Sequence, residues 1–429
     1  MAVLSVPRWR LHQHYTSYSR QRQANPGAEH RLTVVLDGRW RPSNSGQPCR
    51  ATSHGNTTRA EFTTVDGHLV QVRMVPAGCP PRPGPTRRGG AARCTGRSTR
   101  RESRTMTARQ VSPAGLDRYR RARFGMFVHW GLYALHGRGE WNMFEARTPL
   151  TEYRRLADHF EAERFDAREW VDLAEAAGQR YMTVTTRHHD GFSLYDTALS
   201  GFKSTNTPFG RDAFGELAEA CSGRGVKLGA YVSLIDWHHP AFRFREKSKL
   251  AWEDYVGFLH GQVRELCTQY GELGQIWFDG EWPHSAWSRE HADWFAPGGS
   301  YGYPELYDAV HRLQPDAVVL NNRKSVPLPP GEDVQGFEND LPGENTAGFN
   351  TGTVLDGPKE TCLTMNKTWG YVSTDDDYKT VDQLLDTMWR AWSAGSNLLL
   401  NVGPRADGTI PPREQELLRA VGSRLSSQK

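Results

Sequence analysis

From Phe124 onward, short apolar runs rich in β-branched and aromatic residues alternate with longer stretches whose apolar residues recur at helical spacing. Continuous apolar runs are typical of strands that are buried on both faces. Their alternation with amphipathic helices predicts βα units and a parallel sheet. The expected strands are Phe124–Trp130, Tyr181–Thr186, Val226–Val232, Gln275–Phe278, Ala317–Leu320, Asp333–Phe337, Thr368–Val372 and Asn397–Val402.

Amphipathic helices are expected between these strands. The clearest covers Asp166–Ala177 and should end at Gly178. Eight strands in roughly 300 residues favour an α/β fold of the (β/α)8 barrel type, with a doubly wound sheet as the alternative. No glycine-rich phosphate-binding motif follows a strand, so the pattern gives no support to nucleotide binding. The other expected helices are Ala213–Cys221, Ala251–Tyr270, Pro304–Leu313 and Val381–Ala394.

Residues 1–105 differ from the rest of the chain. They contain 18 Arg, no Lys and five acidic residues, in a mixture rich in Pro and Gly. Such a composition predicts disorder or a spurious N-terminal extension, with short strands conceivable at Arg31–Gly38 and His68–Met74. An arm that binds nucleic acid is the functional alternative, because clustered Arg binds phosphates, but we do not expect a nucleic-acid partner. The catalytic domain is expected at residues 106–429.

The chain has 429 residues, of which 37% are apolar and 24% charged. No apolar run is long enough to span a membrane, and the Arg-containing first 30 residues lack the core of a signal peptide. We therefore expect a soluble, cytoplasmic protein without a membrane partner. The six cysteines form no Cys-x-x-Cys pair that would indicate zinc or redox chemistry.

Polar residues follow the ends of several expected strands, where the active sites of barrels lie. Asp279, directly after the apolar run Ile276–Phe278, is the candidate nucleophile, although taken alone it is more typical of a turn residue before Gly280. Histidines and tryptophans at strand ends suit a sugar site, because aromatic faces cover a pyranose and imidazoles bond its hydroxyls. The other strand-end groups are His129-Trp130, His188-His189-Asp190, Asn321-Asn322-Arg323 and Glu338-Asn339-Asp340.

The histidines also allow a metal site built on His129, His188 and His189. Adjacent residues of an extended segment point to opposite sides, so His188 and His189 should not readily share one ion. We therefore expect no metal ligand among the site residues.

Seven motifs in order, from about Phe124 to Pro412, resemble the α-L-fucosidases of glycoside hydrolase family 29. Together they are specific, whereas each alone is weak. They are Phe124–Gly131, Gly139-Glu140-Trp141, Arg187–Phe192, Trp277–Gly280, Asn321-Asn322-Arg323, Thr368–Tyr371 and Asn397–Pro404.

The resemblance implies a retaining exo-glycosidase that hydrolyses terminal α-L-fucose without a cofactor. Asp279 matches the family's nucleophile. His129, His188, His189 and Arg323 match residues that bond fucose hydroxyls. Glu140 and Trp141 match a loop that closes over the sugar. The aromatic residues that match the lining of the sugar pocket are Phe127, Tyr231, Trp277 and Trp369.

The acid/base is harder to place, because the motif around it departs from the family pattern at Val334 and Gly336. Its spacing selects Glu338, with Glu344 as the main rival and Glu281 as a lesser one. The chain ends one helix after the last expected strand, so we expect a barrel without a C-terminal β-sandwich. Two other functions stay open, namely a fucose-binding barrel that is catalytically weak and a metal-dependent barrel hydrolase.

Overall fold

The computed structural model describes residues 108–427 except 244–248, 282–293, 295–298 and 349, together with the strand residues 51–54, 57–63 and 69–74. The chain divides into two units, Met1–Glu102 and Ser103–Lys429. In the first, strands β1 (Ala51–His54), β2 (Thr57–Thr63) and β3 (Leu69–Met74) form an antiparallel sheet in that order. The sequence suggested β3 but not its partners, and the other expected strand, Arg31–Gly38, lies outside the described residues.

The second unit contains eight parallel strands in the order β8-β7-β6-β5-β4-β11-β10-β9. A parallel bridge between Leu320 and Val334 joins the two edge strands, so the sheet is a nearly closed barrel, as predicted. The strands are β4 (Phe124–Val128), β5 (Tyr181–Arg187), β6 (Lys227–Ser233), β7 (Gln275–Asp279), β8 (Val318–Asn321), β9 (Gln335–Glu338), β10 (Lys359–Thr364) and β11 (Ser396–Val402).

One expected strand was wrong. The seventh strand is Lys359–Thr364, which pairs with both β9 and β11, whereas the segment Thr368–Val372 is a loop beyond its end. Strand Lys359–Thr364 carries the charged residues Lys359 and Glu360, which obscured its apolar pattern. The aromatic residues Trp369 and Tyr371 gave the loop the apolar pattern of a strand, although they belong to no strand.

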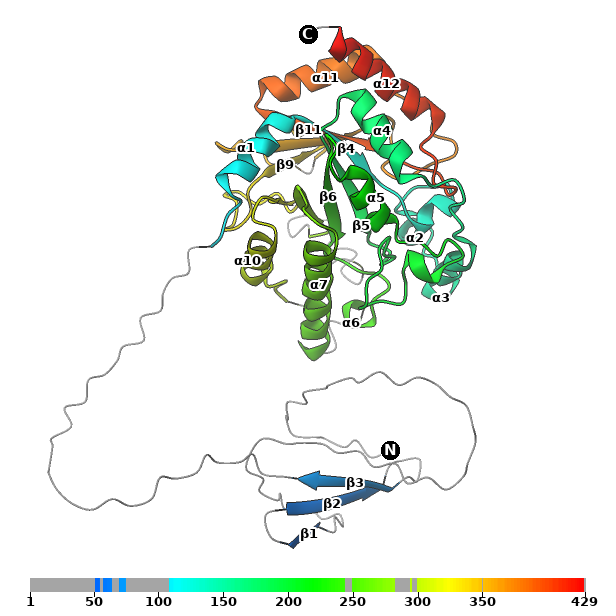
Figure 1. The fold of residues 1–429 in the computed structure, drawn as a ribbon, viewed down its shortest axis with the longest axis vertical. Coiled ribbons are helices and arrows are strands. Elements are labelled where there is room, and N and C mark those ends of the chain that lie inside the picture. The colour runs from blue at the N-terminus through cyan, green and yellow to red at the C-terminus, as the bar shows by residue number, and fades with distance from the viewer. Residues whose placement is uncertain are drawn as a thin grey trace, which may run out of the picture. The chain divides into compact units, whose positions relative to one another are not determined.

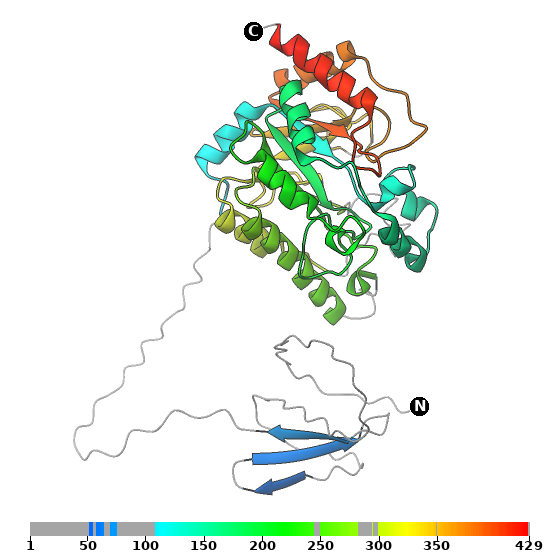
Figure 2. The same cartoon turned by 45° about the vertical axis from the view of Figure 1, so that its right-hand side comes forward.

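Helices surround the outside of the strands (Figures 1 and 2). None of those that the structure describes has the length and apolar character needed to cross a membrane. The helices are α1 (Pro113–Ala122), α2 (Asn142–Glu145), α3 (Leu150–Tyr153), α4 (Ala167–Ala177), α5 (Ala213–Cys221), α6 (Pro240–Arg243), α7 (Lys249–Gln269), α10 (Tyr303–Leu313), α11 (Val381–Ser393) and α12 (Pro412–Ser426), with 3-10 turns at Leu132–Leu135, Arg154–His159 and Ser204–Asn206.

Local sequence explains the ends of these helices. Asp166 caps the start of α4 by accepting hydrogen bonds from the backbone N–H groups of Arg168 and Glu169, and Gly178 ends the helix with φ of 83°. Helix α4 packs against α12, where a Cβ on Gly422 would lie 1.9 Å from the carbonyl oxygen of Ala176. Only glycine permits this approach of the two helices.

Alternate residues of the strands divide between two cores. Met126, Ala230, Ile276 and Leu400 belong to the larger core that the surrounding helices cover. The residues between them in sequence belong to a second cluster inside the barrel, as the two-residue period of strands requires. This inner cluster includes Phe127, Tyr181, Tyr231, Trp277, Val318, Leu320, Val334, Cys362 and Leu399.

Candidate active site

The inner cluster determines which polar residues reach the C-terminal opening of the barrel. Asp279 follows Trp277 by two positions and His129 follows Phe127 by two positions, so both continue the inward-facing rows. By the same period, Asn401 lies beyond Leu399. The strand period thus brings a carboxyl, an imidazole and an amide from three strands to one opening.

Two carboxyl groups share one amide in this opening. Asn322, immediately after β8, donates its Nδ2 to Asp279 Oδ1 at 3.1 Å and to Glu338 Oε2 at 2.7 Å. The two carboxyl oxygens are therefore closer to each other than the sum of these distances. This is compatible with the about 5–5.5 Å between the carboxyl groups of retaining glycosidases.

Asp279 is held on both of its oxygens. The Tyr231 hydroxyl donates to Oδ2 at 2.9 Å, opposite the bond from Asn322 to Oδ1. Burial, and then the charge of Glu338, raise the pKa of Asp279 to about 7, while the bonds from Tyr231 and Asn322 act to lower it. Asp279 is therefore only partly ionised near neutral pH.

Gly280 lets the chain turn directly after Asp279. Its φ is 104°, and a Cβ there would lie 3.1 Å from Ile235 Cγ1 and 3.3 Å from the Ile235 backbone nitrogen. A side chain at this position would strain the backbone and push against Ile235. The glycine that made Asp279 resemble a turn residue is thus part of how the carboxyl is placed.

Two of the expected histidines have a defined tautomer. Asn401 Nδ2 donates to the Trp369 carbonyl, so its Oδ1 accepts from His129 Nδ1 at 2.7 Å. Ser233 Oγ donates to the Ile235 carbonyl and accepts from His189 Nδ1 at 2.7 Å. In both rings Nε2 is left as an acceptor, which suits a bond from a sugar hydroxyl.

The histidines are uncharged at neutral pH. Burial lowers the pKa of His129 to about 3. Burial, and then the charges of neighbouring imidazoles and of Arg187, hold the pKa values of His188 and His189 well below the usual range. His188 Nδ1 is buried and has no hydrogen-bond partner among the described residues. A buried polar atom of this kind suits a ligand that completes its bonding.

The expectation that His188 and His189 point to opposite sides was wrong. Their ring centroids lie 4.1 Å apart. Strand β5 ends at Arg187 after a register shift between Thr185 and Arg187, so the two histidines are not on extended backbone. His188 stacks on the Tyr231 ring at 5.5 Å, whereas His189 Nε2 lies 3.7 Å from Asp279 Oδ2. Both therefore line the same opening.

Aromatic rings form the wall below the carboxyl pair. The Phe127 ring lies 5.2 Å from that of Trp277 and 5.9 Å from that of Trp369. Tyr231 stacks on Trp277 at 5.5 Å. The four aromatic residues that the sequence assigned to the sugar pocket thus come from three strands and one loop and lie together.

A buried carboxylate fixes this wall from beneath. Glu360 accepts hydrogen bonds from Trp277 Nε1 at 2.9 Å, from the hydroxyls of Tyr181 at 2.7 Å and Tyr119 at 2.9 Å, and from Gln275 at 3.1 Å. Burial raises its pKa. This role has no signature in the sequence, because the residues that bond Glu360 are far from it along the chain.

Glu140 and Trp141 lie at the rim of the opening. Glu140 is buried, and its Oε2 accepts the backbone N–H of Gly370 at 2.6 Å, which ties it to the loop that carries Trp369. Burial raises the pKa of Glu140 to about 7. The Trp141 ring lies 5.0 Å from that of His189. Two separate loops therefore meet beside the histidines.

The remaining candidates are engaged elsewhere. Arg323 donates to Glu281 Oε2 at 3.2 Å and to Ser325 Oγ at 2.6 Å, and its guanidinium lies over the Tyr303 ring at 4.6 Å.

The two rivals of Glu338 as the acid/base are Glu281, which pairs with Arg323, and Glu344. Glu344 pairs with Arg390 Nη2 at 2.6 Å on the surface. Neither rival of Glu338 shares a hydrogen-bond donor with Asp279 in the part of the chain that the structure describes.

Sequence reasoning missed the residues that hold Glu338 in place. Asn350 Oδ1 accepts the Glu338 backbone N–H at 3.0 Å, and Asn350 Nδ2 donates to the Glu338 carbonyl at 2.8 Å and to Asp340 Oδ2 at 2.7 Å. Asn322 was noticed only as part of a motif. An asparagine in a loop carries no sequence signal of its partners.

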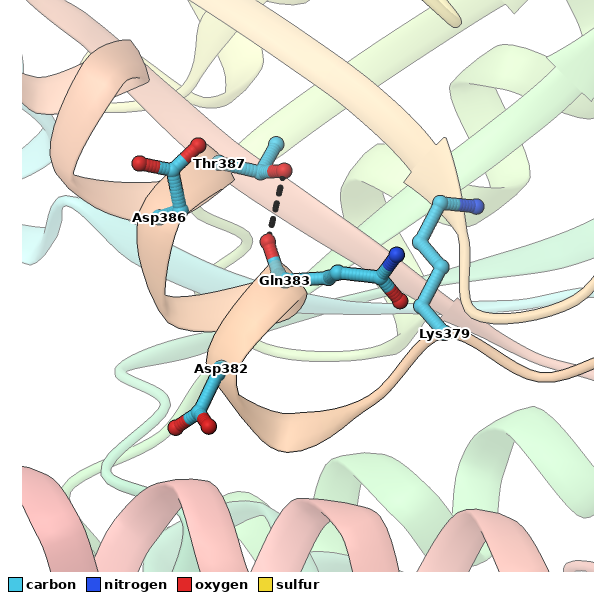
Figure 3. Close-up of a pocket in the computed structure, with 5 residues that line it drawn as sticks. All are labelled: Lys379, Asp382, Gln383, Asp386 and Thr387. Atoms are coloured by element: carbon cyan, nitrogen blue, oxygen red, sulfur yellow. Dashed lines mark hydrogen bonds between the residues drawn. The ribbon is translucent and has the colours of Figure 1, made fainter.

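Two hollows formed by described residues lie away from this opening. One, with a volume of about 470 Å³, is at the start of α11 (Figure 3). It has no aromatic lining, and the only hydrogen bond drawn there runs from Thr387 Oγ1 to the Gln383 carbonyl at 2.8 Å within the helix. Among the described residues, no three His, Cys, Asp or Glu side chains are arranged to hold a metal ion.

Comparison with known proteins decides the family. A model of the family described as alpha-L-fucosidase matches residues 93–429, which is most of the chain. The chain belongs to the alpha-L-fucosidase family. The match includes every candidate residue of the site, and the (β/α)8 barrel is the fold of the solved relatives of this family.

Relatives in the alpha-L-fucosidase family resemble the chain in sequence and structure. The tissue alpha-L-fucosidase of Rattus norvegicus is 32% identical over 336 residues, which cover 71% of this chain and 66% of the rat protein. The chain thus spans about two thirds of that relative's length. Alpha-L-fucosidase isoenzyme 1 from Paenibacillus thiaminolyticus has a TM-score of 0.62 at 35% identity, covering 73% of this chain and 75% of that one.

A third relative in the family is nearly covered in full. The alpha-L-fucosidase AlfC from Lactobacillus casei, solved in complex with alpha-L-fucose product, has a TM-score of 0.58 at 29% identity. The alignment covers 73% of this chain and 98% of that one. This chain therefore aligns with nearly the whole solved chain of that relative.

Proposed function

We propose that this chain is a retaining exo-α-L-fucosidase that removes terminal α-L-fucose from fucosylated glycosides. The observation that carries the proposal is the pair Asp279 and Glu338, bridged by the Asn322 amide at 3.1 and 2.7 Å. Membership of the alpha-L-fucosidase family and the fucose complex of the Lactobacillus casei relative support fucose as the sugar.

In the first step, Asp279 attacks the anomeric carbon of fucose while Glu338 gives its proton to the departing glycosidic oxygen. The bond to the aglycone breaks and a fucosyl ester forms on Asp279. In the second step, Glu338 takes a proton from water, which attacks the anomeric carbon and releases Asp279. Two inversions give net retention, and the proton on the pair returns to its starting place.

The surrounding residues have separate roles in this proposal. The neutral imidazoles of His129, His188 and His189 bond the sugar hydroxyls. Phe127, Trp277 and Trp369 form an apolar surface for the C6 methyl, where the hydroxyl of a galactose-type sugar would lack a partner. This arrangement selects a 6-deoxy sugar. Arg323 is the remaining proposed sugar ligand, and Glu140 and Trp141 close over the sugar.

Release of nitrophenol from an aryl α-L-fucoside tests the activity. We expect turnover of the fucoside and none of the matching α-galactoside. A strong chelator should leave the rate unchanged, which separates this mechanism from a metal-dependent one. Folded protein that binds fucose but cleaves neither the aryl fucoside nor fucosylated oligosaccharides would be a lectin-like barrel, and the proposal would be wrong.

Azide rescue tests the two carboxyl roles. Asp279→Gly should lose nearly all turnover and recover part of it with azide, giving β-fucosyl azide, whereas Glu338→Ala rescued by azide should give the α-azide. The matched control is Glu344→Ala, which removes the surface pair with Arg390. Loss of activity in Glu344→Ala together with full activity in Glu338→Ala would move the acid/base role to Glu344.

A further inference from the structure

The amide that bridges the two carboxyls is itself held by a cation. Lys324 Nζ donates a hydrogen bond to Asn322 Oδ1, and it lies 3.5 Å from the Gly336 carbonyl of β9. Because an ammonium group only donates, it requires the oxygen of the amide to face it. The NH2 end of Asn322 must then face Asp279 and Glu338. If the amide were turned over, its oxygen would face two carboxyl groups.

The backbone also favours a specific role for Lys324. Its φ is 59°, in the left-handed region that residues other than glycine, asparagine and aspartate seldom adopt. Such a conformation is strained for a lysine and is often found at functional sites. In addition, Asn322 donates its backbone N–H to the Phe278 carbonyl at 2.8 Å, which fixes the start of this turn to β7.

Lys324 is available for this task because no carboxylate within the described residues forms an ion pair with it, whereas the neighbouring Arg323 pairs with Glu281. Its positive charge also reaches the interior, since it acts to lower the pKa of Cys362 beneath the carboxyls. Lys324 is thus linked to the carboxyl pair through the Asn322 amide.

The geometry points to Lys324 as a positioning residue that orients and polarises the Asn322 amide and so holds its NH2 group towards both Asp279 and Glu338. This inference rests on the proposed function of the pair. Other groups around the pair stay unchanged when Lys324 is replaced. They are Tyr231 on β6, His189 after β5, Glu140 at the rim, Cys362 on β10 and the Arg323 and Glu281 ion pair.

A double-substitution experiment on the full chain tests this inference. Lys324→Met keeps an unbranched side chain, one atom shorter, and the backbone conformation, but it removes the charge and the donor. We expect kcat on an aryl α-L-fucoside to fall about tenfold, KM to stay within about twofold, and the pH profile to move to higher pH, because a lost cation raises the pKa of a carboxyl. In an Asn322→Ala background, Lys324→Met should have no further effect.

Two further variants keep the test interpretable. Lys324→Gln retains a neutral donor and should lie between the wild type and Lys324→Met. Lys227→Met should behave like the wild type. It removes an ion pair with Glu272 at the N-terminal end of β6, away from the carboxyl pair at the C-terminal ends of the strands. Circular dichroism and unfolding temperature check that each variant folds.

Three results would overturn the inference. The first is an unchanged kcat and pH profile in Lys324→Met. The second is an equal loss of kcat when Lys324→Met is made in the wild type and in the Asn322→Ala background. The third is a rise in KM alone, which would indicate direct substrate contact. The shift to higher pH in Lys324→Met should also appear in the pH dependence of its unfolding temperature. This measurement depends on the protonation of buried groups and needs no turnover. An inactive wild type that still shows this shift would refute the proposed function and leave the role of Lys324 standing.

Discussion

Removal of the Tyr231 hydroxyl is the most direct test of how the barrel controls its nucleophile. This hydroxyl donates to Asp279 Oδ2 at 2.9 Å, while the ring stacks on His188 and Trp277, both at 5.5 Å. Tyr231→Phe therefore removes one hydrogen bond and keeps the aromatic wall. The carboxyl retains the bond from Asn322 on its other oxygen.

The magnitude follows from the kind of bond that is lost. A buried hydrogen bond to a charged group contributes about 1.5–3 kcal/mol. Because about 1.4 kcal/mol corresponds to tenfold, kcat/KM should fall by about tenfold to 150-fold. The bond lowers the pKa of Asp279, so its loss should raise that pKa above about 7 and move the pH profile of kcat/KM to higher pH.

The assay is kcat/KM for an aryl α-L-fucoside across the pH range, for the wild type and two variants. Tyr195→Phe is the matched control, because its hydroxyl is buried without a hydrogen-bond partner among the described residues. It should keep both the rate and the profile of the wild type. A Tyr231→Phe variant with a profile identical to that of Tyr195→Phe would refute the role of this bond.

Three further predictions concern stability and positioning. Burial raises the pKa of Glu414 to about 8. The stability that this carboxyl contributes is therefore complete below about pH 4 and is lost as the pH rises towards 8. Glu414→Gln should make the fall in unfolding temperature at alkaline pH less steep. Glu360→Ala leaves four buried donors without their acceptor, and should lower the free energy of unfolding by at least about 3 kcal/mol in urea titrations. Asn350→Ala frees the backbone of Glu338, and should lower kcat about tenfold while KM changes little.

Each of these predictions has a result that contradicts it. Parallel stability curves for the wild type and Glu414→Gln from acidic to alkaline pH would show that this carboxyl does not ionise on unfolding. A Glu360→Ala variant as stable as the wild type would mean that water or a rearranged side chain replaces the carboxylate. If Asn350→Ala and the neighbouring control Thr351→Ala have the same kcat, the clamp on Glu338 has no catalytic role.

The fold could be predicted to a large extent because barrel strands and helices have local signatures. Both faces of β7 and β8 are buried, so these strands appear in the sequence as the apolar runs Ile276–Phe278 and Val318–Leu320. The caps of α4 are local as well. The strand missed at Lys359–Thr364 shows the limit of this reasoning, since Glu360 is charged in sequence but satisfied by distant donors in the folded protein.

The sequence by itself determined the barrel, the family resemblance and the presence of Asp279 and the histidines at strand ends, because these depend on periodicity and on motifs of neighbouring residues. Only the tertiary structure decided which carboxyl shares an amide with Asp279, that His188 and His189 face the same opening, and that Lys324 holds the Asn322 amide. These relations join side chains from different strands and loops. Distances across a barrel depend on how the whole chain closes, and no local pattern encodes them.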